Sequence, residues 1–234
     1  MDPRREYTTP KGIANRLSKP KCYNSKMDTI EQHSIKQFTT WAKNYDNPFT
    51  SITFQLTNSK IVSLLNPKAN SSLLDVGCGS GILLHKLLLL NRNLKLYGLD
   101  ITPKMVEVAN AKFKNNPDVK ITLGSAIKMP YKNNSFDYVT CASSFHHHPN
   151  PALSINEMVR VLKPGGKLII LDGCFDGIIR KFLSLLENIY HNEGKTFRLT
   201  SKEMYNLYKH AGLIQIKQST FLYFALITEG SKLN

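Results

Sequence analysis

The sequence predicts an α/β fold: a doubly wound, seven-stranded sheet that is mostly parallel, ends in an antiparallel hairpin and carries helices on both faces. Two observations support this prediction. From Ser72 onward, short apolar runs alternate with helical patterns, which is typical of parallel strands joined by right-handed crossovers. In addition, a Gly-rich turn at 77–81 separates the first strand from an apolar helix, so a ligand can approach the backbone there.

The segment before the sheet is expected to form a tail followed by a lid. Residues 1–27 contain prolines and basic residues but little apolar periodicity, which indicates a flexible basic tail. Residues 28–66 show two helical stretches that end before Pro67, and we expect them to form a helical lid. The core domain then covers residues 67–234, and we expect Trp41 of the lid to be buried.

The core elements follow in a regular order. The predicted strands lie at residues 72–76, 94–99, 119–123, 136–141, 167–171, 213–219 and 221–228, with helices at 82–90, 103–114 and 151–162. The last two strands are almost contiguous, so they should pair as an antiparallel hairpin at the sheet edge. Before them we expect an amphipathic helical insert at about 174–199 and a helix opened by a capping box of Thr200 and Glu203.

Composition limits the cellular setting. The chain has 31 Lys and Arg against 17 Asp and Glu, a net charge of +14, which favours anionic partners although a solvated basic surface has the same composition. No apolar run approaches the length of a membrane span, and the N-terminus lacks a secretory pattern. The cysteines are widely spaced, without a C-x-x-C pair. We expect a cytoplasmic monomer or homodimer with no transmembrane segment and no metal site.

Two carboxylates flank the Gly-rich turn and narrow the ligand. The spacing G-x-G-x-G differs from the G-x-G-x-x-G of dinucleotide sites, which argues against the rival interpretation as a nicotinamide-dependent dehydrogenase. Asp75, two residues before Gly77, would repel a pyrophosphate but suits an amine-bearing ligand. Asp100 ends the second strand, where a carboxylate can accept hydrogen bonds from ribose hydroxyls.

Several segments together carry a resemblance to a known family. They are LDVGCGSG at 74–81, GLDITPKM at 98–105, MPY and NSFDYV at 129–131 and 134–139, FHH and PNP at 145–147 and 149–151, and EMVRVLKPGGKL at 157–168, preceded by FTTWAKNYD at 38–46. In this order they resemble the class I S-adenosylmethionine-dependent methyltransferases, and within that class the small-molecule and quinone-biosynthesis group. The resemblance covers roughly residues 38–228.

The resemblance implies a Rossmann-like sheet that binds S-adenosyl-L-methionine and releases S-adenosyl-L-homocysteine. It implies cofactor contacts at Asp75, Gly77, Cys78, Gly79, Gly81, Asp100, Ile101, Met105, Ser125, Ala126 and Ala142. Asp75 would meet the methionine ammonium, and Asp100 the ribose hydroxyls. Ser125 departs from the pattern, because the family usually has an acid there that accepts from the adenine amine. A serine hydroxyl accepts more weakly, so we expect lower cofactor affinity.

Methyl transfer to a small hydrophobic or aromatic acceptor is the function that the resemblance implies, with a base needed only if the acceptor must lose a proton. Candidate catalytic residues are His146, His147 and Tyr45. Adjacent histidines cannot all face one point, so we expect one of 146–148 in the core, one in the pocket and one in solvent. Two alternatives remain: a tRNA or rRNA methyltransferase that binds RNA through its basic surface and tail, and an inactive cofactor-binding partner protein.

Overall fold

The computed structural model describes residues 20–42, 44–47, 52–90, 93–174, 199–222 and 225–234. The tail predicted at 1–27 lies outside the described residues except for 20–27, which belong to a helix. The insert predicted at 174–199 lies outside them except for its two end residues. Among the helices of the described residues, none is long and apolar enough to cross a membrane.

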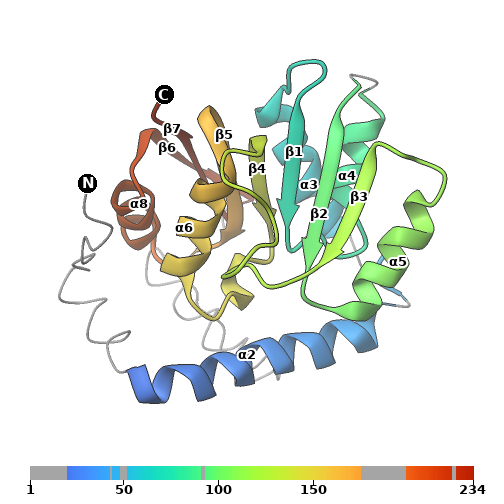
Figure 1. Cartoon of the computed structure of the whole chain (residues 1–234), viewed down its shortest axis with the longest axis horizontal. Helices are drawn as coiled ribbons and strands as arrows, with labels where there is room; N and C mark the ends of the chain where they lie inside the picture. The colour runs from blue at the N-terminus through green and yellow to red at the C-terminus, as the bar shows by residue number, and fades with distance from the viewer. Residues whose placement is uncertain (1–19, 43, 48–51, 91–92, 175–198, 223–224) are drawn as a thin grey trace.

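The sheet has seven strands in the order β3-β2-β1-β4-β5-β7-β6 (Figure 1), which confirms the predicted fold class. The strands are β1 Ser72–Val76, β2 Lys95–Asp100, β3 Val119–Leu123, β4 Phe136–Ala142, β5 Leu162–Gly173, β6 Leu213–Phe221 and β7 Ala225–Lys232. Strands β1 to β5 pair in parallel, whereas β7 is antiparallel to both β5 and β6. The chain therefore places β7 inside the sheet, and β6 forms the edge.

The helices begin and end where the sequence provides local signals. They are α2 Pro20–Trp41, α3 Ile52–Leu65, α4 Ile82–Leu88, α5 Pro103–Phe113, α6 Pro151–Val161 and α8 Ser201–His210, with a 3-10 turn η1 at Phe145–His147. The predicted capping box is confirmed, because Thr200 and Glu203 each bond the other's backbone N–H at the start of α8. Asn150 caps α6 by accepting from the backbone N–H of Leu153 at 3.1 Å.

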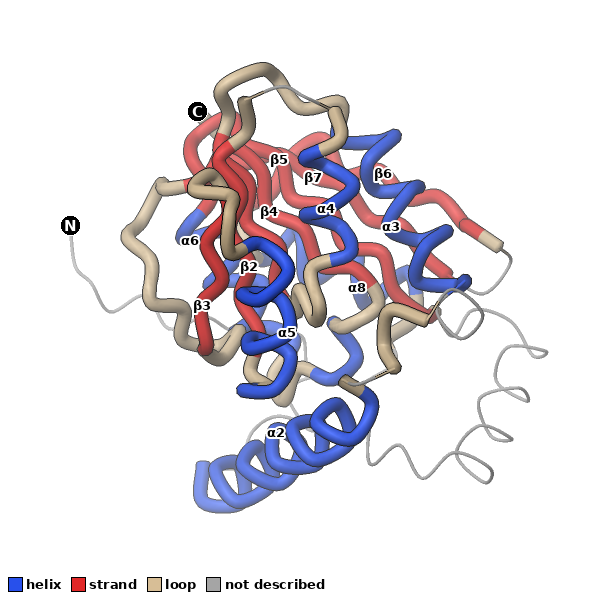
Figure 2. Tube along the Cα trace, turned by 90° about the vertical axis from the view of Figure 1, so that its right-hand side faces the viewer, coloured by secondary structure: helices blue, strands red, loops and turns tan. Residues whose placement is uncertain are grey.

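Helices lie on both faces of the sheet (Figure 2). Two apolar clusters fill the space between the sheet and these helices. Neighbouring side chains of β1 point to opposite faces, as expected for a strand. Leu74 packs with residues of α6 and α8, whereas Leu73 packs with residues of α3 and α4. Both leucines are fully buried, so β1 is a central strand covered on both sides.

Helix α2 lies across the carboxyl ends of the parallel strands (Figure 1), in contact with α5 and η1. Its spacing of 34, 38 and 42 turns Ser34, Phe38 and the following Ala42 toward the core domain. Trp41 falls outside this stripe, and the prediction that it is buried is wrong: it is 42% exposed and touches Phe38 edge-on at 5.7 Å between ring centroids.

Candidate functional site

The Gly-rich turn after β1 adopts a backbone that other residues rarely tolerate. Gly77, Gly79 and Gly81 all have positive φ angles, of 74°, 53° and 81°. Gly77 also has no space for a side chain, because a Cβ there would lie 2.2 Å from the Ser144 hydroxyl. The turn is held against β2, where the Leu99 carbonyl accepts from the Gly77 N–H at 2.7 Å.

Asp100 joins the end of β2 to this turn. Its Oδ2 accepts from the Gly79 N–H and its Oδ1 from the Thr102 N–H, both at 2.8 Å. The side chain is buried, and this burial raises the pKa of the carboxyl although the backbone donors act in the opposite direction. Each carboxylate oxygen has a second lone pair, so Asp100 can still accept hydrogen bonds from a ligand.

Asp75 is a second buried carboxylate close to Asp100. Burial raises its pKa to about 7, against the hydrogen bond that Thr140 Oγ1 donates at 2.9 Å, and the charge of Asp100 adds to the increase. Within the described part of the chain, neither carboxylate forms an ion pair with a cationic side chain. Two buried acids without a cation favour a ligand that brings positive charge.

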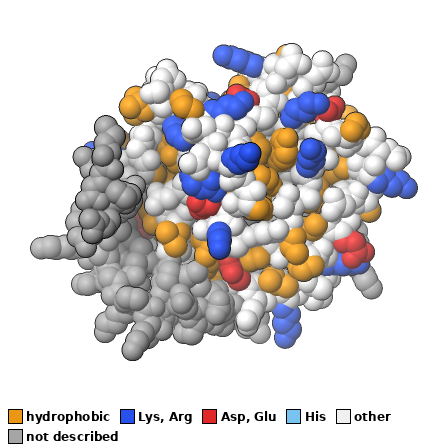
Figure 3. Space-filling model, viewed as in Figure 1, with side chains coloured by type: hydrophobic (Ala, Val, Ile, Leu, Met, Phe, Trp, Pro, Cys, Tyr) orange, Lys and Arg blue, Asp and Glu red, His pale blue; other side chains and the backbone are white. Residues whose placement is uncertain are grey.

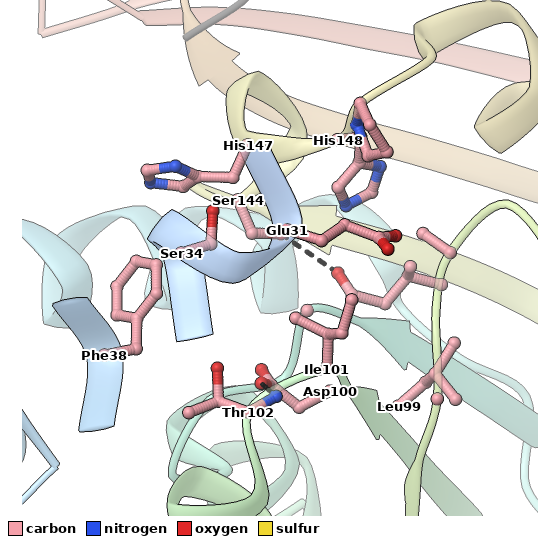
Figure 4. Close-up of a pocket in the computed structure, with 15 residues that line it drawn as sticks. Glu31, Ser34, Phe38, Leu99, Asp100, Ile101, Thr102, Ser144, His147 and His148 are labelled. Atoms are coloured by element: carbon pink, nitrogen blue, oxygen red, sulfur yellow. Dashed lines mark hydrogen bonds between the residues drawn. The ribbon is translucent and has the colours of Figure 1, made fainter. Parts of the chain in front are cut away.

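A cavity of about 60 Å³ opens beside these residues (Figure 4). Four strand ends and helix α2 line it, with residues 76, 77, 99–102, 124, 126, 144 and 147–149 from the core and Glu31, Ser34 and Phe38 from α2. Pockets for drug-sized ligands have volumes of roughly 300–1,000 Å³. The cavity lies below this range, so we expect α2 or the segment after it to shift outward when a cofactor of that size binds.

The segment after α2 closes over the turn. The Tyr45 ring lies 3.5 Å from where a Cβ of Gly79 would stand, and it stacks on Phe54 with centroids 5.2 Å apart. Burial raises the pKa of the Tyr45 phenol, with Asp100 next in importance, so the phenol is neutral at physiological pH. Asp46 bonds the Ser80 hydroxyl and pairs with Lys112.

Glu31 of α2 reaches the end of β3. Its Oε1 accepts from the Ser125 hydroxyl at 2.6 Å, a contact that links α2 to the core domain. Sequence reasoning missed Glu31, because the two residues are 94 positions apart and a single sequence carries no signal for such a contact.

The three histidines after β4 have different environments. His146 donates its backbone N–H to Asp172 Oδ2 at 2.8 Å, and its Nδ1 lies 2.7 Å from Oδ1 of the same carboxylate. Burial alone would raise the pKa of Asp172, but His146 and the backbone donors hold it below its usual value. Asp172, at the end of β5, was also missed by sequence reasoning. A buried acid that ends a strand beside the site is the signal that could have identified it.

His147 and His148 line the cavity. The His147 ring lies edge-on to Phe38 at 5.0 Å and is 4.0 Å from the His146 ring. His148 is buried, its Nδ1 has no hydrogen-bond partner among the described residues, and burial lowers its pKa to about 4. The expectation that one histidine faces solvent is wrong, because none of the three is exposed.

The structure brings only part of the predicted set to the cavity wall. Of the predicted residues, Gly77, Asp100, Ile101, Ala126 and His147 line it. Gly79, Ser125, Tyr45 and His146 each contact a residue of the wall, and Asp75 directly precedes Val76 of the wall in β1. The remaining residues do not appear in the wall formed by the described residues: Cys78, Gly81, Met105 and Ala142. Cys78 and Met105 are buried.

These groups fit the cofactor that the sequence resemblance implies. S-adenosylmethionine carries an ammonium and a sulfonium, which suit the acids Asp75 and Asp100, and a ribose, whose hydroxyls need an acceptor such as Asp100. At Gly77 the absence of a side chain lets a ligand come close to the backbone of the turn, where a Cβ would not fit.

Comparisons with known proteins agree with this fit. Residues 74–170 match the family described as a methyltransferase domain. A demethylmenaquinone methyltransferase of Lactococcus lactis subsp. lactis is 28% identical over 81% of this chain and 79% of its own length. One from Staphylococcus carnosus is 32% identical, and the alignment covers 58% of each protein, less than two thirds of that relative.

A solved structure shares the fold. A chain in the complex between the Haloferax volcanii Trm112 methyltransferase activator and a methyltransferase aligns with a TM-score of 0.71 at 20% identity, over 84% of this chain and 98% of that chain. The strand order, the Gly-rich turn with its two acids, and the matches in sequence lead to one conclusion. Residues 74–170 match a methyltransferase domain, and the whole set supports a class I S-adenosylmethionine-dependent methyltransferase.

Proposed function

We propose that this enzyme methylates a small aromatic acceptor of the quinol type, bound between the histidine segment and a lid formed by residues 28–66. The observation that carries the proposal is the cavity, which Gly77 lines and in which Asp100 lies across from His147 and His148 (Figure 4). Phe38 of α2 adds an apolar, aromatic surface beside His147. An aromatic ring fits such a surface by edge-on and stacked contacts.

The cofactor would lie along the strand ends. We assign Asp75 to the methionine ammonium, Asp100 to the ribose hydroxyls, and Ile101 with Ala126 to the adenine. The burial of both acids supports this assignment. A buried carboxylate without a cationic partner is costly, and a cationic ligand reduces that cost. The turn at Gly77 gives the room that the methionine end needs.

When bound, S-adenosylmethionine would supply an activated methyl group that would bond to the acceptor as its bond to sulfur breaks, with the electron pair staying on sulfur. The protein aligns the acceptor and removes its proton. Asp172 accepts from the Nδ1–H of His146, which leaves the lone pair on Nε2. We propose that this Nε2 takes the hydroxyl proton of the acceptor. A histidine oriented by a carboxylate acts as a general base in this way in other enzymes. Tyr45 covers the turn and is assigned to excluding water.

The names of the relatives support an aromatic acceptor. Both bacterial relatives are named demethylmenaquinone methyltransferases, so their acceptor contains a quinone ring.

The buried, neutral imidazole of His148 suits a polar ring substituent, since its Nδ1 has no partner among the described residues.

A methyl-transfer screen tests the proposal. The full chain is incubated with tritiated S-adenosylmethionine and either a reduced short-chain demethylmenaquinone in detergent or bulk tRNA and rRNA. We expect label in the quinol and none in RNA, and His146→Asn should lower the rate at least tenfold. His210→Asn, an exposed histidine of α8, is the matched control and should not change it. Label only in RNA would refute the acceptor assignment.

A further inference from the structure

The order of the strands sets the direction in which the cofactor lies. The ends of β1, β2 and β3 are neighbours in the sheet, and adjacent strands are separated by about 4.8 Å. If the methionine end lies at the turn after β1 and the ribose at Asp100 after β2, the adenine must lie over the end of β3. This step depends on the proposed cofactor assignment above.

The cavity wall beside the ends of β2 and β3 has an apolar part that Glu31 reaches. Leu99, Ile101 and Ala126 line this side of the cavity and can hold the faces of a planar ring. Glu31 is the acid that reaches the same side, where its Oε1 accepts from Ser125 at 2.6 Å. Figure 4 shows the Glu31 carboxylate pointing away from Phe38 and His147, toward the side of Leu99.

The chemistry of this contact selects one kind of ring. An ionised carboxylate only accepts hydrogen bonds, and adenine presents an exocyclic amine that only donates. Ser125 uses Oε1 of Glu31, and a carboxylate has further acceptor positions on both oxygens. A base with a carbonyl at the same position, as in hypoxanthine, would place oxygen lone pairs against the carboxylate.

We propose that Glu31, a residue of the lid helix α2, accepts the hydrogen bond of the adenine amine and so determines recognition of the cofactor's base. At the end of β3 the side chain that meets Glu31 is the hydroxyl of Ser125, so the carboxylate on this side comes from α2. Cofactor recognition and lid closure therefore share one carboxylate. An adenine seated over β3 holds α2 in place through Glu31, and α2 in turn completes the adenine site.

Calorimetric titration with the reaction product and with a deaminated analogue of it tests this role. S-adenosylhomocysteine and its deaminated analogue S-inosylhomocysteine differ only in the amine and the ring nitrogen next to it. The wild-type chain should bind the adenine form at least tenfold more tightly, since a hydrogen bond to a charged group is lost in the analogue. Glu31→Gln should reduce this preference to about twofold or less, because a Gln amide can rotate to donate to a carbonyl.

The variant Ser125→Ala distinguishes recognition of the adenine amine by Glu31 from the contact that holds α2 on the core domain. It removes the contact between lid and core but keeps the Glu31 carboxylate, so it should retain the preference for the adenine form. A preference unchanged in Glu31→Gln, or lost equally in Ser125→Ala, overturns the inference while leaving the proposed function intact. A wild-type chain that binds neither product refutes the cofactor assignment itself. Circular dichroism of each variant confirms that it is folded.

Discussion

Binding of the cofactor product should release a proton from Asp75. Burial raises the pKa of Asp75 to about 7 in the free protein, so the carboxyl is about 0.9 protonated at pH 6 and about 0.1 protonated at pH 8. An ammonium at hydrogen-bond distance favours the ionised form and moves the pKa well below 6. We therefore expect S-adenosylhomocysteine to release about 0.9 proton at pH 6 and about 0.1 at pH 8.

Calorimetry in buffers of different ionisation enthalpy measures this release directly, because the observed heat changes with the buffer in proportion to the protons released. Asp75→Asn cannot titrate, so the buffer dependence at pH 6 should disappear and the affinity should fall. Asp118→Asn is the control, since Asp118 pairs with Lys95 and lies just before β3, at the amino-terminal ends of the parallel strands and away from the site. Heat that does not depend on the buffer in the wild-type chain at pH 6 would refute the reasoning.

The same group predicts how stability depends on pH. The pKa of Asp75 in the folded state, about 7, lies above its ordinary value of 3.8, so the folded chain binds the extra proton between these values. The contribution of Asp75 to the free energy of unfolding is fully present below pH 4 and is lost as pH rises through 7. The difference is on the order of 4 kcal/mol, from about three pKa units. Urea unfolding of Asp75→Asn should show a flatter profile over this range.

Three further substitutions test other parts of the site. Gly77→Ala should lower the free energy of unfolding by about 2–4 kcal/mol in urea, since it combines a left-handed backbone with a steric clash. Gly212→Ala has the same backbone strain but open space and should cost only about 1 kcal/mol; equal losses would exclude the clash. Asp172→Asn should lower kcat at least tenfold with little change in KM. It should also shift the acid limb of the pH profile of kcat to lower pH, because a protonated His146 loses the neighbouring negative charge. An unchanged pH profile would show that the contact of His146 with Asp172 has no part in catalysis. Asp100→Ala should weaken S-adenosylhomocysteine at least tenfold by calorimetry, and unchanged affinity would refute the ribose assignment.

The fold could be predicted because its signals are local. Alternating runs of apolar residues identified the strands, and the capping box at Thr200 identified the start of α8. The position of β7 between β5 and β6 could not be predicted in the same way, because pairing with β5 depends on contacts between distant segments. Trp41 shows a similar limit: its helical spacing differs by only one residue from that of the buried stripe at 34, 38 and 42.

The site was predictable where a motif fixes the backbone and not where it depends on a tertiary contact. Gly77 and Asp100 lie in the wall of the cavity because the turn and the strand end that carry them are adjacent in a parallel sheet. Glu31 and Asp172 approach the site from α2 and β5, and their partners, Ser125 and His146, are far away in sequence. Only the folded chain shows these pairs.

Contacts of α2 and of the segment at Tyr45 cover the proposed cofactor site. The cavity of about 60 Å³ is smaller than pockets that hold drug-sized ligands, so we expect α2 or the segment at Tyr45 to open before the cofactor binds. Opening breaks the bonds of Ser125 to Glu31 and of Ser80 to Asp46, each worth about 1.5–3 kcal/mol net because the acceptor is a carboxylate. The half-exposed pair of Asp46 and Lys112 adds at most about 1 kcal/mol. These polar contacts together favour the closed form by roughly 3–7 kcal/mol, and the ring contacts of Phe38 with His147 and of Tyr45 with Phe54 add to this. Contacts that reform on closing do not weaken the final affinity, so these bonds limit the rate of binding, and only contacts that the cofactor replaces reduce its affinity.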